Sequence, residues 1–213
     1  MNHTALAALR AAALALPALP ALASAPPAAA DPPPGGATVE IATVNGSGCP
    51  RGTAAVAVFN DGDDFRVSIT TEPARAEAGG ASAPADSRKP CQVNLKVHVP
   101  QGYTYAVRQT DYSGDAHLEP GASATLSSSA YLQGTTPPKP ATRTLRGPYS
   151  GPWRFEISES EPVFSPCGEQ RNQNFGAELR VDMGDSDPAK TNFIETDGKT
   201  VYHFAWKRCP TSM

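Results

Sequence analysis

The chain of 213 residues is poor in charge, in aromatic side chains and in histidine. Charged residues make up 18% of the sequence and aromatic residues 7%, and there are four histidines. The formal net charge of −3 leaves no basic excess of the kind that binds nucleic acid or an anionic membrane surface. After residues 1–30, no apolar run is long enough to cross a bilayer. We therefore expect neither a nucleic-acid nor a membrane partner.

Motifs for catalysis and metal binding are also missing. The sequence has no Gly-x-Ser-x-Gly elbow for a serine nucleophile and no Cys-x-x-Cys pair for zinc or redox chemistry. His98, His117 and His203 show no metal-ligand spacing. The acidic run Asp61–Asp64 lacks the spacing of a calcium loop. We predict no cofactor and no metal, and we favour a protein that is not an enzyme.

The chain begins with the features of an export signal. A positively charged start, including Arg10, precedes an apolar stretch, Ala11–Leu22, that is short for a membrane span. Small-residue cleavage sites follow Ala23 and Ala30, and we favour the second. The sequence thus predicts a signal peptide at 1–30, a Pro/Gly-rich spacer at 31–38 and a secreted, extracellular domain at 39–213.

Beyond the spacer, alternation of apolar and polar residues predicts β-strands. Two alternating segments, Ala54–Phe59 and Phe65–Thr70, flank Asn60-Asp61-Gly62, which is a hairpin-turn signal. After Cys91, the side chains of Gln92 and Asn94 are expected on a solvated face, opposite buried valine and leucine. Further strands are expected at 103–109, 116–118, 124–133, 153–157, 179–181 and 201–207.

Turn residues separate these strands. With 22 prolines and 18 glycines, the chain does not favour long helices. The Glu72–Pro90 stretch, rich in Ala, Gly and Pro, is expected to be a mobile surface loop. About eight or nine short strands at this spacing predict an all-β fold, an antiparallel β-sandwich.

The four cysteines agree with export, because an even number in a secreted chain indicates disulfides. Cys49 and Cys91 each precede a predicted strand, and in an up-down-up arrangement those two starts lie at the same end of a sheet. Cys167 and Cys209 bracket the last strands in a similar way. We favour the pairs Cys49–Cys91 and Cys167–Cys209. The main alternative joins Cys49 to Cys209 and Cys91 to Cys167.

Seven short stretches of the predicted domain occur together in the order typical of one family. They are Gly48–Pro50, Arg88–Leu95, His98–Tyr103, Thr110–Tyr112, Gly147–Tyr149, Ser165–Gly168 and Ala205–Cys209. Through them the chain resembles the secreted domain-of-unknown-function family 4360 of fungi and filamentous bacteria. It departs from the family pattern at Pro90, where asparagine is common, and at Asp115, where an aromatic residue is common. The resemblance implies a secreted all-β domain with two disulfides, and it supplies no catalytic residue.

Asp111, Tyr112 and Tyr149 are the candidate ligand-binding residues. Both tyrosines lie among Gly, Ser and Asp in predicted loops, within two of the matching stretches. Exposed tyrosine rings suit binding surfaces and can stack on sugar faces. We therefore expect a non-catalytic, monomeric module that binds extracellular or cell-wall polysaccharide.

Two other functions stay open at this point. One is a secreted hydrolase, since glycoside hydrolysis needs two carboxyl groups across one bond. Asp111, Asp115 and Glu119 form one such carboxylate set, and a second set lies within Glu156–Glu161. The other function is a module that binds another secreted protein, for example as an inhibitor.

Overall fold

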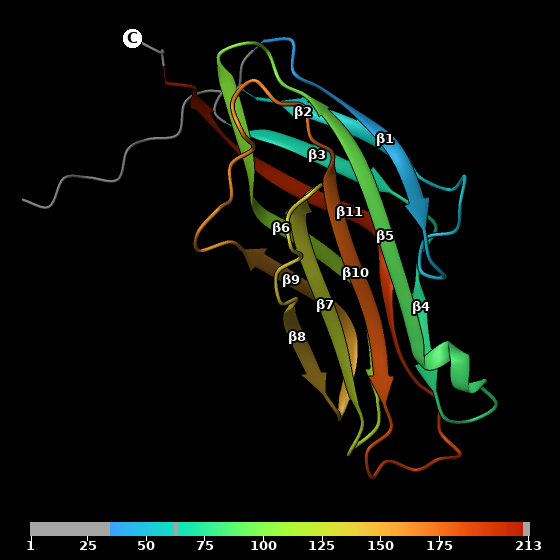
Figure 1. Ribbon diagram of the computed structural model, residues 1–213. Coiled ribbons are helices and arrows are strands. Elements are labelled where there is room, and N and C mark those ends of the chain that lie inside the picture. The colour runs from blue at the N-terminus through green and yellow to red at the C-terminus, as the bar shows by residue number, and fades with distance from the viewer. Residues whose placement is uncertain (1–34, 62–63, 211–213) are drawn as a thin grey trace, which may run out of the picture.

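Each strand has one apolar face to bury, and the protein buries these faces between two antiparallel sheets (Figure 1). The computed structural model describes residues 35–61 and 64–210, and the predicted signal peptide at 1–30 lies outside them. The all-β sandwich is confirmed, with eleven strands in place of the eight or nine expected. Among the described residues, no helix is long and apolar enough to cross a membrane.

The front sheet, nearer the viewer in Figure 1, has five strands. Their spatial order is β1 (Thr38–Asn45), β5 (Arg88–His98), β10 (Gln173–Asp182), β7 (Ser123–Leu132) and β8 (Ala141–Arg146). The rear sheet has the order β2 (Ala55–Asn60), β3 (Phe65–Thr70), β11 (Asn192–Arg208), β6 (Tyr103–Leu118) and β9 (Tyr149–Ser158), and β4 (Arg75–Ala78) pairs with β11. The β2–β3 hairpin confirms the turn predicted from the sequence.

Two loop predictions were wrong because strand partners came from distant parts of the chain. The segment Glu72–Pro90 was expected to be a loop, yet it contains β4, a 3-10 turn at Pro84–Ser87 and the start of β5. The segment 111–115 was expected to separate two strands, yet β6 continues through it. Asp111 pairs with Val201 of β11 on one side and with Glu156 of β9 on the other.

The long strands β6 and β11 run side by side, and each contributes residues to both of the two core clusters. The first cluster is built around aromatic rings, with the Phe65 and Trp206 centroids 5.1 Å apart in an edge-to-face arrangement. The second cluster packs Trp153 of the rear sheet together with Leu126 of the front sheet. Both clusters lie between the sheets, so both sheets are needed to complete either one.

An irregularity in β11 lies between the two core clusters. The ladder with β6 shifts register between Thr196 and Thr200, which is the kind of insertion that bends a strand. Gly198 in this bulge has φ +80°, and a Cβ there would lie 2.5 Å from the Thr71 carbonyl oxygen. Glycine is thus required at this position, both for its backbone conformation and for the close approach of the neighbouring chain.

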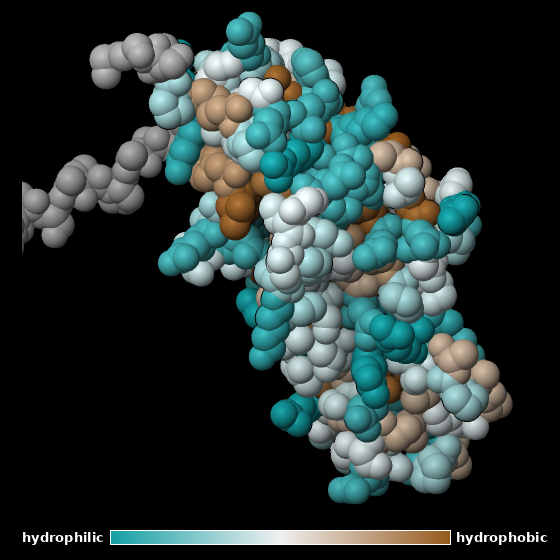
Figure 2. Space-filling view, in the orientation of Figure 1, coloured by the Kyte–Doolittle hydropathy of each residue, from teal (hydrophilic) through white to brown (hydrophobic). Residues whose placement is uncertain are grey.

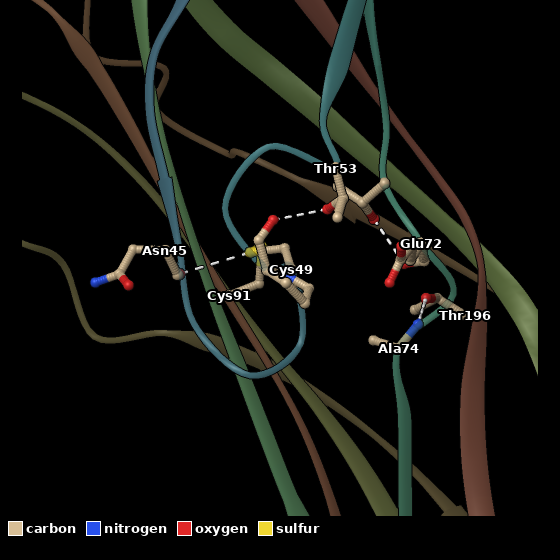
Figure 3. The surroundings of a disulfide bond; sticks show 9 residues. Asn45, Cys49, Thr53, Glu72, Ala74, Cys91 and Thr196 are labelled. Atoms are coloured by element: carbon tan, nitrogen blue, oxygen red, sulfur yellow. Dashed lines mark hydrogen bonds between the residues drawn. A yellow bond between two sulfur atoms is a disulfide. The ribbon is translucent and has the colours of Figure 1, made fainter.

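The two disulfides join Cys49 to Cys91 and Cys167 to Cys209, which confirms the favoured pairing. Figure 3 shows the first bridge, which links the loop after β1 to β5. Cys49 is fully buried in the first core cluster, whereas Cys167 is exposed. The first bridge therefore belongs to the core, and the second lies near the surface.

The two bridges allow a controlled comparison, because each closes a loop with a sequence separation of 42 residues. Loop closure alone predicts the same contribution from each, about 4 kcal/mol. Replacing Cys49 and Cys91 together by alanine also removes buried sulfur from the core, so this variant should lose roughly 1 kcal/mol more than the Cys167/Cys209 double variant. Urea unfolding of both variants measures the difference, and equal losses would show that the buried sulfur adds nothing.

Candidate functional site

The residues predicted to bind a ligand do not lie together in the structure. Asp111 and Tyr112 are neighbours within β6, and successive strand residues point to opposite faces of a sheet. Asp111 therefore lies on the outer face of the rear sheet, whereas Tyr112 points between the sheets. Asp111 pairs with Glu156 of β9. Tyr149 begins β9 and lies seven positions from Glu156 along that strand. At about 3.4 Å per residue, this is a separation of roughly 24 Å.

Tyr112 is a core residue and offers no ring face to a ligand. Its side chain is 3% exposed, and its hydroxyl lies 2.8 Å from the Ser128 Oγ of the front sheet. Burial raises the pKa of Tyr112 to about 12, so the phenol stays neutral. The expectation of an exposed Tyr112 ring was wrong, because the residue lies in a continuous strand and not in a loop.

Tyr149 is half-buried against the second core cluster. Its hydroxyl donates a hydrogen bond to the carbonyl oxygen of Pro152 at 2.6 Å. This bond fixes the ring at the start of β9, so Tyr149 has a local structural role that accounts for its position.

Asp111 is the centre of an ion network on the outer face of the rear sheet. Its carboxylate accepts a hydrogen bond from Gln109 Nε2 at 2.7 Å and lies 3.1 Å from both Arg154 Nη2 and His203 Nε2. The other ring nitrogen of His203 lies 3.5 Å from Asp64 Oδ1. The imidazole thus stands between two carboxylates, each of which also contacts an arginine.

This network does not provide the groups that a hydrolase needs. Burial opposes ionisation of Asp111, but the hydrogen bonds from Gln109 and His203 and the charges of His203 and Arg154 outweigh it and lower the pKa of the carboxyl. A general acid in glycoside hydrolysis needs a raised pKa. Both ring nitrogens of His203 face carboxylates, so neither is directed at a nucleophile. Among the described residues, no three His, Cys, Asp or Glu side chains are placed to bind a metal ion.

A different surface, on the front sheet, brings hydrogen-bonding side chains together. These side chains form two rows, and the first row crosses four strands in register. Asn94 of β5 pairs with Thr43 of β1 on one side and with Asn174 of β10 on the other. Asn174 pairs in turn with Tyr131 of β7. These positions alternate with buried residues such as Val93, so they point outward. The β-bulge between Ile41 and Thr43 places Thr43 on this outer face.

A second row lies directly beside the first. Gln92 of β5 pairs with Asn45 of β1 and with Gly176 of β10, which pairs with Ser129 of β7. We call the two rows together the amide face; its members are Thr43, Asn94, Asn174 and Tyr131, and Asn45, Gln92, Gly176 and Ser129. Figure 2 shows the front of the molecule as mainly hydrophilic or intermediate in hydropathy, with small and separate hydrophobic areas.

An open cleft of about 830 Å³ lies at the amide face. Its lining combines amides of both rows with Asn172, Gln133 and the Arg51–Gly52 part of the loop after β1. Arg51 is the only ionisable side chain among the described residues that line it. A shallower depression of about 370 Å³ shares Gln92 with the cleft and extends over Gly176 and Ser129. The two hollows therefore adjoin at Gln92, and few of their described lining residues are ionisable.

Three of the amides hold one another in place. Asn172 Nδ2 donates to Asn94 Oδ1 at 2.7 Å, and Asn94 Nδ2 donates to Asn174 Oδ1, also at 2.7 Å. Within the described part of the chain, the side-chain Oδ1 of Asn172 and the side-chain Nδ2 of Asn174 have no further partner. The chain of bonds thus presents an acceptor at one end and a donor at the other, in fixed positions, which lowers the entropy lost when a ligand binds.

Local sequence patterns indicated only part of this surface. Gln92 and Asn94 were expected on a solvated strand face, and this is confirmed. Asn174 lies outside the strands expected from the sequence, and it meets Asn94 across 80 residues of chain. No local pattern specifies that pairing.

Replacing Tyr112 by phenylalanine should destabilise the protein by about 1–2 kcal/mol, because the buried Ser128 hydroxyl loses its partner. Tyr149→Phe is the matched control, since it removes a hydroxyl whose bond is exposed to solvent, and its loss should be well below 1 kcal/mol. Denaturant unfolding of both variants measures this difference, and equal losses would contradict the assignment of Tyr112 to the core.

The ion network should make stability depend on pH through Asp111. A carboxyl whose pKa is lowered by folding stabilises the protein above its unfolded pKa, and this contribution disappears as pH falls through the folded pKa. The stability difference between wild type and Asp111→Asn should therefore be full above about pH 5 and should shrink as pH falls through the lowered pKa of Asp111.

Urea unfolding at a series of pH values measures the contribution of Asp111 to the free energy of unfolding. Asp115→Asn is the control, because it changes an exposed carboxylate of the same strand. A difference between wild type and Asp111→Asn that stays constant over the acid range would contradict the role of the network.

Two solved structures align with this chain, both with low TM-scores. The enzymatically active domain of tailspike protein 4 of bacteriophage CBA120 aligns with a TM-score of 0.23 and 8% identity, over 82% of this chain and 20% of that chain. The cowpea mosaic virus top component aligns with a TM-score of 0.24 and 10% identity, over 89% of this chain and 91% of that chain. At these scores, neither similarity bears on function.

Comparison of sequences is more informative. An "Uncharacterized secreted protein" of the fungus Arthroderma benhamiae is 28% identical over 172 residues, which cover 78% of this chain and 69% of the fungal protein. Residues 36–209 match the family described as "Domain of unknown function (DUF4360)". This match spans both sheets and all four cysteines, and it confirms the resemblance found in the sequence. The chain belongs to the DUF4360 family.

Proposed function

We propose that the protein is a secreted, non-catalytic module that binds extracellular polysaccharide on the amide face. The observation that carries this proposal is the pair of neutral, hydrogen-bonding rows beside the 830 Å³ cleft. Sugars present many hydroxyl groups, each of which can both donate and accept a hydrogen bond. An amide offers donors and an acceptor in one side chain, so it matches hydroxyl groups of either orientation.

The position of the surface also supports binding of an extended ligand. The rows cross four strands, and at a strand spacing of about 4.8 Å they extend for roughly 14 Å. The cleft is open, and the depression beside it continues over the second row. Such a surface accommodates several units of a polymer and does not enclose a small molecule.

The proposal places the protein outside the cell. Two disulfides are typical of chains folded in an oxidising compartment, and the fungal relative is named as secreted. The predicted signal peptide at 1–30 agrees with export. The site proposed here differs from the candidate residues Tyr112 and Tyr149: Tyr112 is buried in the core, and Tyr149 is half-buried with its hydroxyl bonded to Pro152.

The test measures how much purified protein is removed from solution by insoluble cellulose, chitin, β-glucan and peptidoglycan. Gln92→Ala and Asn174→Ala should each weaken binding about fivefold, because one hydrogen bond contributes about 1 kcal/mol and 1.4 kcal/mol corresponds to a tenfold change. Asn60→Ala removes an exposed amide from β2 of the opposite sheet and should bind as wild type.

The same tubes are assayed for soluble sugar. Release of sugar by the wild type would contradict a non-catalytic role. Failure of the wild type to bind any of the four polymers would reject the proposed function and direct attention to a protein partner.

A further inference from the structure

The outer face of the rear sheet and the cleft at the amide face differ in charge. On the outer face of the rear sheet, Arg66, Arg108 and Arg154 contact the carboxylates of Asp61, Asp64 and Asp111, among others. The cleft at the amide face has Arg51 as the only ionisable side chain among its described lining residues. The depression over the second row adds Arg88 and Glu178, which are paired with each other at 2.6 Å.

A binding surface of this kind has few charged side chains that could bind a charged polymer. An anionic chain is held by clustered lysine and arginine, and its binding weakens as salt screens those charges. Neutral amides and hydroxyls instead match uncharged hydroxyl and acetamido groups. Their hydrogen bonds depend little on ionic strength.

Gly176 is unusual in the second row, because the fold does not require glycine there. Its φ angle is not positive, and neither ladder of β10 is irregular at this position. A Cβ added to Gly176 would meet one atom within 4 Å, the Ser129 Oγ at 2.9 Å, which can rotate away. Glycine weakens the interior of a strand, and where no bulge explains it, it often marks the close approach of a ligand.

The surroundings of Gly176 suit a single sugar ring. The residue lines the 370 Å³ depression, with Gln92 on one neighbouring strand and Ser129 on the other. Asn174 is the next outward position along β10. A sugar ring placed over the backbone of Gly176 would have the hydrogen-bonding side chains of Gln92, Ser129 and Asn174 at three of its edges.

We infer that the amide face binds an uncharged polysaccharide and that one sugar unit sits directly over Gly176. This inference rests on the proposed function and makes it more specific. Gly176 would then be a specificity-determining position, since any larger side chain fills the space that the sugar occupies.

The experiment compares Gly176→Leu with wild type in depletion assays on cellulose, chitin and β-glucan. The leucine should weaken binding at least tenfold, while Gly176→Ala should lie between the two. Thr70→Leu places the same leucine side chain at an exposed position of β3 on the rear sheet, and it should bind as wild type. Thermal unfolding should show that all three variants stay folded, because a strand tolerates these residues.

A second arm tests the charge of the ligand. Wild-type binding to the neutral polymers should be unchanged between about 0.05 M and about 1 M salt, where exposed charges are increasingly screened, and cross-linked polygalacturonate should not be bound. Binding only to polygalacturonate, with loss at high salt, would overturn the inference and leave the proposed function standing. Unaltered binding by folded Gly176→Leu would also overturn it. Failure of the wild type to bind any polymer would reject the proposed function itself.

Discussion

The strands β6 and β11 lie side by side from the pair Tyr103–Arg208 to the pair His117–Phe193, and this ladder positions nearly every other part of the protein. Its inward side chains contribute to both core clusters, with Trp206 in the first and with Tyr112 and Ile194 in the second. Its outward side chains include Asp111 and His203, which form the ion network. The front sheet then covers the inward side of the ladder and leaves its own outer face free to carry the amide rows.

The local patterns of the sequence predicted the elements whose partners are close in the chain. The β2–β3 hairpin and the solvated face of β5 follow from alternation and turn residues, and the structure confirms them. The favoured disulfide pairs are confirmed for a similar reason, because each joins cysteines on either side of strands that the sequence already indicated. Here the physical constraints act over short distances, and a single sequence contains them.

The remaining features depend on contacts between distant segments. β4 is short and rich in alanine, and it is a strand because β11 pairs with it. The polar run around Asp111 has the composition of a turn, yet β9 and β11 hold it extended from both sides. This pairing explains why Asp111 and Tyr112 cannot share a site: a turn could expose both side chains, whereas a strand sends them to opposite faces. The amide rows could not be predicted from the sequence for the same reason, since Asn94 and Asn174 become neighbours only when β5 and β10 pair.

The arrangement of the disulfides has a consequence for the covalent integrity of the chain. The two bridges follow one another in sequence and do not interlock, so no covalent bond other than the backbone connects the part up to Cys91 with the part from Cys167 onward. The segment 133–140 lies between these parts and is exposed throughout, as protease-sensitive loops usually are. A single cut there would produce two fragments, each with its own internal bridge. Only the ladders and the shared core would then hold the halves together, much as in a non-covalent heterodimer.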